Sequence, residues 1–240
     1  MCNAQRVNGI LNGTLAEPRI NPPAGIVTAN PIADVTTYLN GFSGRFYDVQ
    51  FAISNAASPN SFTQADLTAI RNLSVSTTAA FDAWLLGPGQ APTSQLLAQI
   101  PNGLNLSAVT QNQFLNLLGS NGGSPASQLW NLLVTQLRAS GQPARQGIQV
   151  VASKLIAGKR PHLVPITDSF VRVEMGISGW AKTWACSHAL MTNPGIQAQL
   201  ATLGAGLIAN GPYAGGVNPA SLTELRLLDL ALWTFHRRRL

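Results

Sequence analysis

Asp168 is the residue whose surroundings most suggest chemistry. It is the only acidic residue of Gly147–Val173, and it follows a basic loop that ends at Pro165. A carboxylate in a basic, partly apolar setting can stabilise a cationic transition state or position a water molecule. Its neighbours Thr167 and Ser169, like aspartate itself, are residues that often cap helix N-termini. The sequence therefore leaves two roles open for Asp168, catalysis and helix capping.

Positive charge is concentrated around this residue. The 240 residues include 15 basic and 9 acidic ones, which gives a formal net charge of +6. Between positions 138 and 182, seven basic residues stand against only Asp168 and Glu174, so this part of the chain carries most of the excess. The seven are Arg138, Arg145, Lys154, Lys159, Arg160, Arg172 and Lys182. Such clustering favours an anionic partner such as nucleic acid, and a merely solubilising surface is the alternative.

Motifs for metals, cofactors and common nucleophiles are missing. Three histidines and two cysteines show no ligand spacing, so neither a metal site nor a cofactor is expected. No G-x-S-x-G motif, P-loop or dinucleotide-binding fingerprint occurs. Cys2 and Cys186 form no disulfide framework, and a reducing cytoplasm is the simpler inference. Because no signal peptide and no membrane-spanning stretch of roughly 18 apolar residues is recognisable, we expect a cytoplasmic protein.

Helical periodicity predicts an all-α fold. Apolar residues recur at helical spacing, capping residues precede several of these stretches, and no alternating strand pattern recurs. Residues 1–30 are expected to form an irregular arm, and Gly41–Asp48 an aromatic loop. Residues 31–240 then form a single helical domain of one or two lobes, with a helical hairpin-like unit at 144–175. The predicted helices are Asp34–Leu39, one that starts at Ser61 or Thr63, Thr77–Leu86, Thr93–Ile100, Ser107–Leu118, Ser127–Arg138, Val150–Ala157, one that opens around Asp168, Trp180–Leu190, Ile196–Ile208 and Leu222–Phe235.

Two segments of the central stretch match a known pair of motifs. Gly147, Ile148 and Gln149 fall where G-V-G stands in L-P-G-V-G-x-x-T-A, and Val164–Val173 (V-P-I-T-D-S-F-V-R-V) matches V-P-V-D-T-H-V-x-R-V. The chain here resembles the helix-hairpin-helix DNA glycosylase superfamily, in which the first motif holds a DNA phosphate and the second carries the catalytic aspartate. The resemblance implies a two-lobed helical bundle that binds DNA and flips a base into a cleft, with Asp168 as the catalytic residue.

Three departures from that pattern bear on the chemistry. Gln149 replaces the second hairpin glycine, so the amide there is less free to approach a phosphate. The lysine that bifunctional members use as a nucleophile has no counterpart, and Val151 stands near its place. In an ungapped match Thr167 takes the place of the aspartate, and a one-residue shift at a helix start rotates a side chain by about 100°. The resemblance thus points either to a monofunctional enzyme or to a scaffold without the chemistry.

Further segments extend the match beyond the central stretch. Ser153–Asp168 fits S-K-L-L-x-x-K-R-P-x-L-x-P-x-x-D, and similar matches occur at Gly44–Tyr47, Phe62–Leu67 and Leu227–Trp233. These segments make residues 38 to 236 similar to an uncharacterised actinobacterial family of unknown function.

Two functions follow from these observations as hypotheses. The first is a monofunctional DNA glycosylase-like enzyme in which Asp168 stabilises the sugar cation left by a flipped base. Its DNA-binding candidates are Gly147, Gln149, Lys154, Lys159, Arg160 and Arg172, and its base-stacking candidates are Trp180, Trp184, Tyr47 and Phe42. The second is a non-catalytic helical binding protein that contacts the DNA backbone or a protein partner. The sequence leaves the oligomeric state open.

Overall fold

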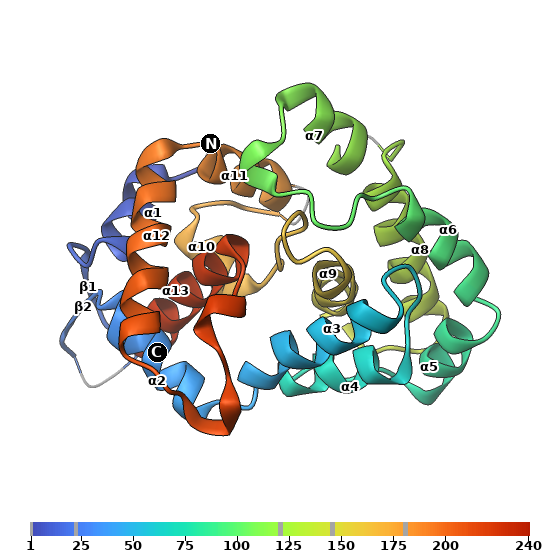
Figure 1. The fold of residues 1–240 in the computed structure, drawn as a ribbon, viewed down its shortest axis with the longest axis horizontal. Coiled ribbons are helices and arrows are strands. Elements are labelled where there is room, and N and C mark those ends of the chain that lie inside the picture. Colours follow the sequence, from blue (N-terminus) through green and yellow to red (C-terminus); the bar gives the residue numbers. More distant parts are fainter. Residues whose placement is uncertain (1, 22–23, 120–121, 145–146, 180–181) are drawn as a thin grey trace. The chain divides into compact units, whose positions relative to one another are not determined.

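The computed structural model describes residues 2–21, 24–119, 122–144, 147–179 and 182–240 (Figure 1). Most of these residues lie in helices, and within the described ranges the single sheet pairs two short strands. The predicted all-α class is therefore confirmed. Similarity to the glycosylase fold stays a prediction.

The chain divides into two compact units. One comprises Met1–Phe42 with Thr167–Leu240, and the other comprises Ser43–Ile166. We call the first the terminal unit, because it combines both ends of the chain, and the second the central unit. The boundary after Ile166 falls inside the hairpin-like unit predicted for 144–175, so the helix before it and the helix after it belong to different units.

The terminal unit is built around its last helix, α13. Its helices are α1 (Ala4–Leu11), α2 (Pro31–Gly41), α10 (Ser169–Glu174), α11 (Lys182–Met191), α12 (Pro194–Ala209) and α13 (Glu224–Arg239), with 3-10 turns at Ala214–Gly216 and Pro219–Ser221. Helix α13 packs against α1, α2, α10 and α12, and every residue from Leu225 to Leu232 is buried. A helix enclosed in this way must pair its charged side chains, and Arg226 accordingly contacts Asp229 and donates to the Tyr38 hydroxyl at 2.9 Å.

The N-terminal residues form regular elements. Helix α1 is capped by Asn3 and buries Val7, Ile10 and Leu11, and strand β1 (Ala16–Pro18) pairs antiparallel with β2 (Ile26–Thr28). Helix α1 packs on α12 and α13. The predicted irregular arm is wrong for these residues. Helix α1 buries only three residues, and this short apolar pattern is hard to recognise in sequence among the surrounding Asn, Gly and Pro.

The two cysteines are joined. Cys2 and Cys186 form a disulfide bond with their Cα atoms 5.4 Å apart, which ties the segment before α1 to α11. The prediction that they form no disulfide framework is wrong, because a sequence separation of 184 gives no sign of their proximity in the fold. Disulfides persist mainly in oxidising compartments, so the cysteines no longer favour a reducing cytoplasm.

The central unit surrounds helix α9 (Ile148–Lys159). Its other elements are α3 (Arg45–Ala57), α4 (Gln64–Asn72), α5 (Ala79–Leu86), α6 (Gln90–Ala98), a 3-10 turn at Leu106–Ala108, α7 (Gln111–Leu118) and α8 (Pro125–Ala139). Helix α9 packs against α3, α4 and α8, and Figure 1 shows it nearly end-on among them. The Phe51 ring lies so close to Gly158 that no Cβ would fit there. The predicted loop Gly41–Asp48 is wrong from Arg45 onward, where α3 begins.

Candidate functional site

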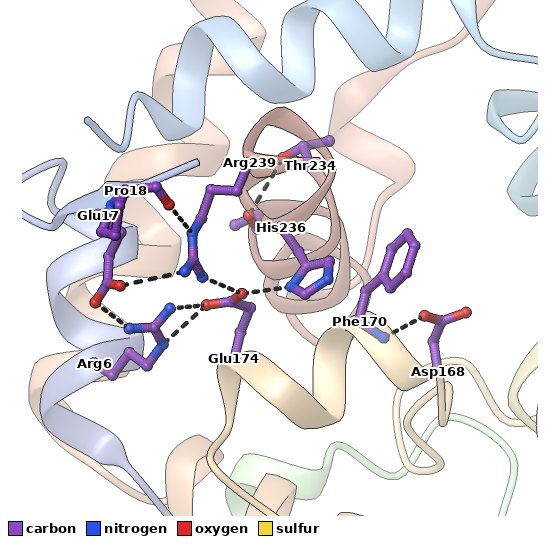
Figure 2. Close-up of polar contacts among 10 residues, drawn as sticks. Arg6, Glu17, Pro18, Asp168, Phe170, Glu174, Thr234, His236 and Arg239 are labelled. Carbon is purple, nitrogen blue, oxygen red and sulfur yellow. Dashed lines mark hydrogen bonds and ion pairs between the residues drawn. The ribbon is translucent and has the colours of Figure 1, made fainter. Parts of the chain in front are cut away.

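Asp168 is the N-cap of α10. Its Oδ1 accepts a hydrogen bond from the backbone N–H of Phe170 at 2.9 Å, and its own backbone is extended, as is usual for N-caps. The side chain is half-exposed, and Figure 2 shows the second carboxylate oxygen pointing away from α10. Of the two roles that the sequence leaves open, capping is therefore the one that this geometry displays.

A buried ion network lies at the other end of α10. Glu174 is fully buried and accepts from Nε and Nη2 of Arg6 at 2.9 and 2.6 Å and from Nη1 of Arg239 at 3.1 Å. Nδ1 of His236 lies 2.6 Å from its Oε1, and Glu17 pairs with both arginines (Figure 2). Burial alone would lower the pKa of Arg6, but hydrogen bonds to Glu174 and Glu17 and their negative charges outweigh burial and raise it. The network thus joins α1, β1, α10 and α13.

The aromatic ring of Phe170 connects the cap to this network. It stacks on the His236 imidazole with centroids 4.4 Å apart, and the Trp233 ring lies 6.2 Å from it. The residue whose amide Asp168 caps therefore packs on the side of α13 that faces Glu174. This arrangement gives the cap a clear structural purpose.

Two cations of the central stretch are directed into the central unit. Lys159 is fully buried, with Nζ 2.8 Å from Oδ2 of Asp66, and Arg160 is 1% exposed. The Arg160 guanidinium donates to the main-chain oxygens of Pro59, Leu97, Ile100 and Lys159 and to the Asn60 side chain. Burial lowers the pKa of Lys159 despite the opposing effect of Asp66, and burial lowers the pKa of Arg160 to about 10. Both side chains hold neighbouring loops through bonds to main-chain oxygens.

The remaining predicted DNA contacts are divided between the two units. Lys154 is 6% exposed and donates to the carbonyl oxygen of Leu73 at 2.9 Å. Gly147 adopts the left-handed conformation (φ 65°, ψ 62°) as the N-cap of α9, and Gln149 is half-buried beside it in the central unit. Arg172 is half-buried in the terminal unit.

The predicted base-stacking residues also differ in their surroundings. Tyr47 is 3% exposed and donates its hydroxyl to the carbonyl oxygen of Lys154 at 2.6 Å, and Trp184 is buried in α11. Trp180 lies outside the described residues. Phe42, which is half-exposed, lies beside a pocket. Of the three described stacking candidates, Phe42 is therefore the one that is left partly exposed.

The pocket lies between α2 and α13 and has a volume of about 480 Å³. Three aromatic rings form its wall: those of Tyr38 and Phe42 are 5.1 Å apart, and the Trp233 ring lies 5.7 and 5.2 Å from them. The other lining residues are Asp34, Thr37 and Gly41 from α2 and Thr234, Arg237 and Arg238 from α13. Asp168 is not among the residues that line it.

Charged side chains form the rim of this pocket. Arg238 binds both carboxylate oxygens of Asp34 through Nη1, at 2.7 and 2.8 Å, and also donates to the carbonyl oxygen of Thr28. The Arg237 guanidinium lies 5.5 Å from the centre of the Trp233 ring. With two arginines and one aspartate, the rim carries a net positive charge. Flat, electron-rich groups that carry negative charge match these walls and this rim.

Sequence reasoning missed most of this pocket. It singled out Phe42 alone and placed it in a loop, whereas Phe42 directly follows α2. The available signal was helical spacing: Tyr38 and Phe42 are four residues apart, as are Trp233 and Arg237. That spacing places each pair on one helix face, but it does not reveal that the two faces meet.

Neither a metal centre nor a membrane span is found in the part of the chain that the structure describes. No group of three or more His, Cys, Asp or Glu side chains there is arranged to hold a metal ion. No helix among the described residues is both long and apolar enough to cross a bilayer.

The fold and the site define a helical protein with an aromatic pocket rimmed by arginines. A family model matches residues 31–236, and the chain therefore belongs to a family of unknown function, DUF6308. This agrees with the expected membership of an uncharacterised family. No curated protein and no solved structure matches the chain.

Replacing Asp66 by asparagine should destabilise the protein by roughly 3–5 kcal/mol, because the buried Lys159 charge then lacks its partner. Asparagine keeps an oxygen that can still cap α4 through the Thr63 amide. Urea denaturation measures the loss. The control is Asp82→Asn, whose partner Arg71 is 44% exposed and which should cost about 1 kcal/mol or less. Equal losses in the two variants would contradict a special role for the buried pair.

Replacing Asp168 by alanine should cost about 1 kcal/mol of unfolding free energy, whereas asparagine should cost little because it caps helices equally well. Thermal unfolding of both variants checks this, with the adjacent, exposed Ser169→Ala as control. An alanine variant as stable as the wild type would show that the cap contributes nothing.

Proposed function

We propose that the protein binds the phosphate backbone of DNA without catalysing a reaction on it. The observation that carries the proposal is the exposed pair Arg237 and Arg238 at the last turn of α13. Exposed arginines gathered at one place attract a polyanion and release its counterions on binding.

Arg19 extends this positive surface. It is exposed and directly follows β1, and its neighbours in sequence are bound to the end of α13: Arg239 Nε donates to Pro18 O, and Ile20 N donates to Arg239 O at 2.6 Å. We call Arg19, Arg237 and Arg238 the C-terminal basic cluster. Arg237 forms no ion pair with any described residue, and Arg238 remains 42% exposed beside Asp34, so both guanidinium groups are open to a phosphate.

The proposal excludes catalysis because the two acidic residues near the glycosylase-like motif, Asp168 and Glu174, already have structural partners. Asp168 caps α10, and Glu174 is enclosed by two arginines and a histidine. The competing explanation for the basic cluster is that it only offsets the negative end of the α13 dipole. Binding measurements separate these explanations, because dipole compensation needs no partner.

Arg237→Gln should weaken DNA binding and reduce by about one the slope of the logarithm of the binding constant against the logarithm of salt concentration. Fluorescence polarisation of a labelled oligonucleotide across a salt series measures both quantities. The matched control is Arg138→Gln, which removes an exposed arginine from the last turn of α8. Binding that is insensitive to salt, or that Arg138→Gln weakens as much as Arg237→Gln, would refute the proposed surface.

Base excision by Asp168 is the second candidate function. It is favoured by the half-exposed carboxylate, whose second oxygen points away from α10 (Figure 2), together with the glycosylase-like motif around it. Under the non-catalytic proposal, neither the wild type nor Asp168→Asn releases a base from duplexes that carry varied lesions. Because asparagine preserves the cap, release by the wild type that is lost in Asp168→Asn would establish the enzyme instead.

A further inference from the structure

We infer that the pocket between α2 and α13 holds an unstacked nucleobase, so that the preferred partner is single-stranded DNA. The inference rests on the proposed backbone binding and adds the kind of strand to it. Arg237 and Arg238 belong both to the pocket rim and to the C-terminal basic cluster, so one site offers ring contacts and phosphate contacts together.

The wall of the pocket is a fixed stacking platform. Tyr38 is 5% exposed, and its position is held by Arg226, whose Nη2 donates to the hydroxyl and whose guanidinium lies 5.7 Å from the ring centre. Phe42 and Trp233 are half-exposed and pack on Tyr38. Aromatic platforms beside a basic groove are how proteins bind single strands with little sequence preference, because every base has a flat face.

The charges of the rim decide between the two kinds of ligand that aromatic walls recognise. Such walls also bind quaternary ammonium groups, for which a nearby carboxylate is favourable. Here Asp34 is already paired with Arg238, and Arg237 adds a positive charge beside Trp233. A cation would meet net repulsion, whereas a base linked to phosphates would not.

A duplex cannot use this pocket without breaking a base pair, since its bases are stacked and paired inside the helix. A single strand offers its bases at much lower cost. The same C-terminal basic cluster should therefore bind both forms, and the pocket should add affinity for the single strand alone.

The experiment compares a labelled oligo-dT of about 10 nucleotides, within the usual site size of single-strand binders, with a duplex of equal length. We expect the wild type to prefer the single strand, and Trp233→Leu to weaken that binding by roughly 5- to 150-fold, the range for loss of one stacking platform, with duplex binding unchanged. Phe42→Leu should act in the same direction. Trp84→Leu is the control, because Trp84 is also half-exposed and packs on a phenylalanine, Phe81, in the central unit.

Circular dichroism of each variant confirms folding, and Phe42→Leu carries the test if Trp233→Leu does not fold. Equal binding of single strand and duplex, unaffected by either variant, would overturn the pocket inference while backbone binding stands. No binding of either form would overturn both. Competition by thymidine monophosphate at concentrations that match the oligonucleotide would identify a nucleotide site and overturn the preference for strands.

Discussion

The terminal unit depends on the burial of one carboxylate. Glu174 has no exposed surface, and an unpaired buried charge costs several kcal/mol, roughly 3–5 when one partner of a buried pair is removed. Its partners come from both ends of the chain: Arg6 from α1, and His236 and Arg239 from α13. His236 and Arg239 are three residues apart and so lie on one side of the helix, which directs the two residues between them elsewhere. Arg237 and Arg238 are thus exposed because the residues on either side of them, His236 and Arg239, pair with the buried Glu174.

Two basic side chains at the end of a helix are buried in the central unit, and two others are exposed in the terminal unit. Lys159 and Arg160 end a helix that is packed on all sides, so their charges are met by a carboxylate and by main-chain oxygens. Arg237 and Arg238 end a helix whose last turn is open on one side. The charges of Lys159 and Arg160 therefore stabilise the fold, whereas the exposed pair Arg237 and Arg238 lies 78 residues further along the chain.

Local signals carried the predictions that succeeded. Apolar spacing identified α8 and α12 to within two residues at each end, and the Thr63 cap with Asp66 marked the start of α4. Helix α1 and the first turn of α3 were missed locally, and the other failures concern contacts over long distances in sequence. The disulfide between Cys2 and Cys186 and the burial of Lys159 are contacts between residues distant in sequence. The pocket likewise needs α2 to meet α13. The sequence of helix α9 did indicate that its cations would be buried, since a segment that is apolar on nearly all sides is typical of a buried helix.

The glycosylase-like motif resembles a catalytic pattern, but a resemblance in sequence need not carry the catalytic activity with it. In the ungapped match, the place of the catalytic aspartate is taken by Thr167, which is fully buried. Asp168, one residue later, is turned to the start of α10 and uses one oxygen on the Phe170 amide. Capping needs an oxygen close to that amide, whereas excision needs a carboxylate beside an open base pocket. The aromatic pocket of the terminal unit is lined by other residues, so the pocket proposed to hold a base does not include Asp168. This separation favours the proposal of binding without excision.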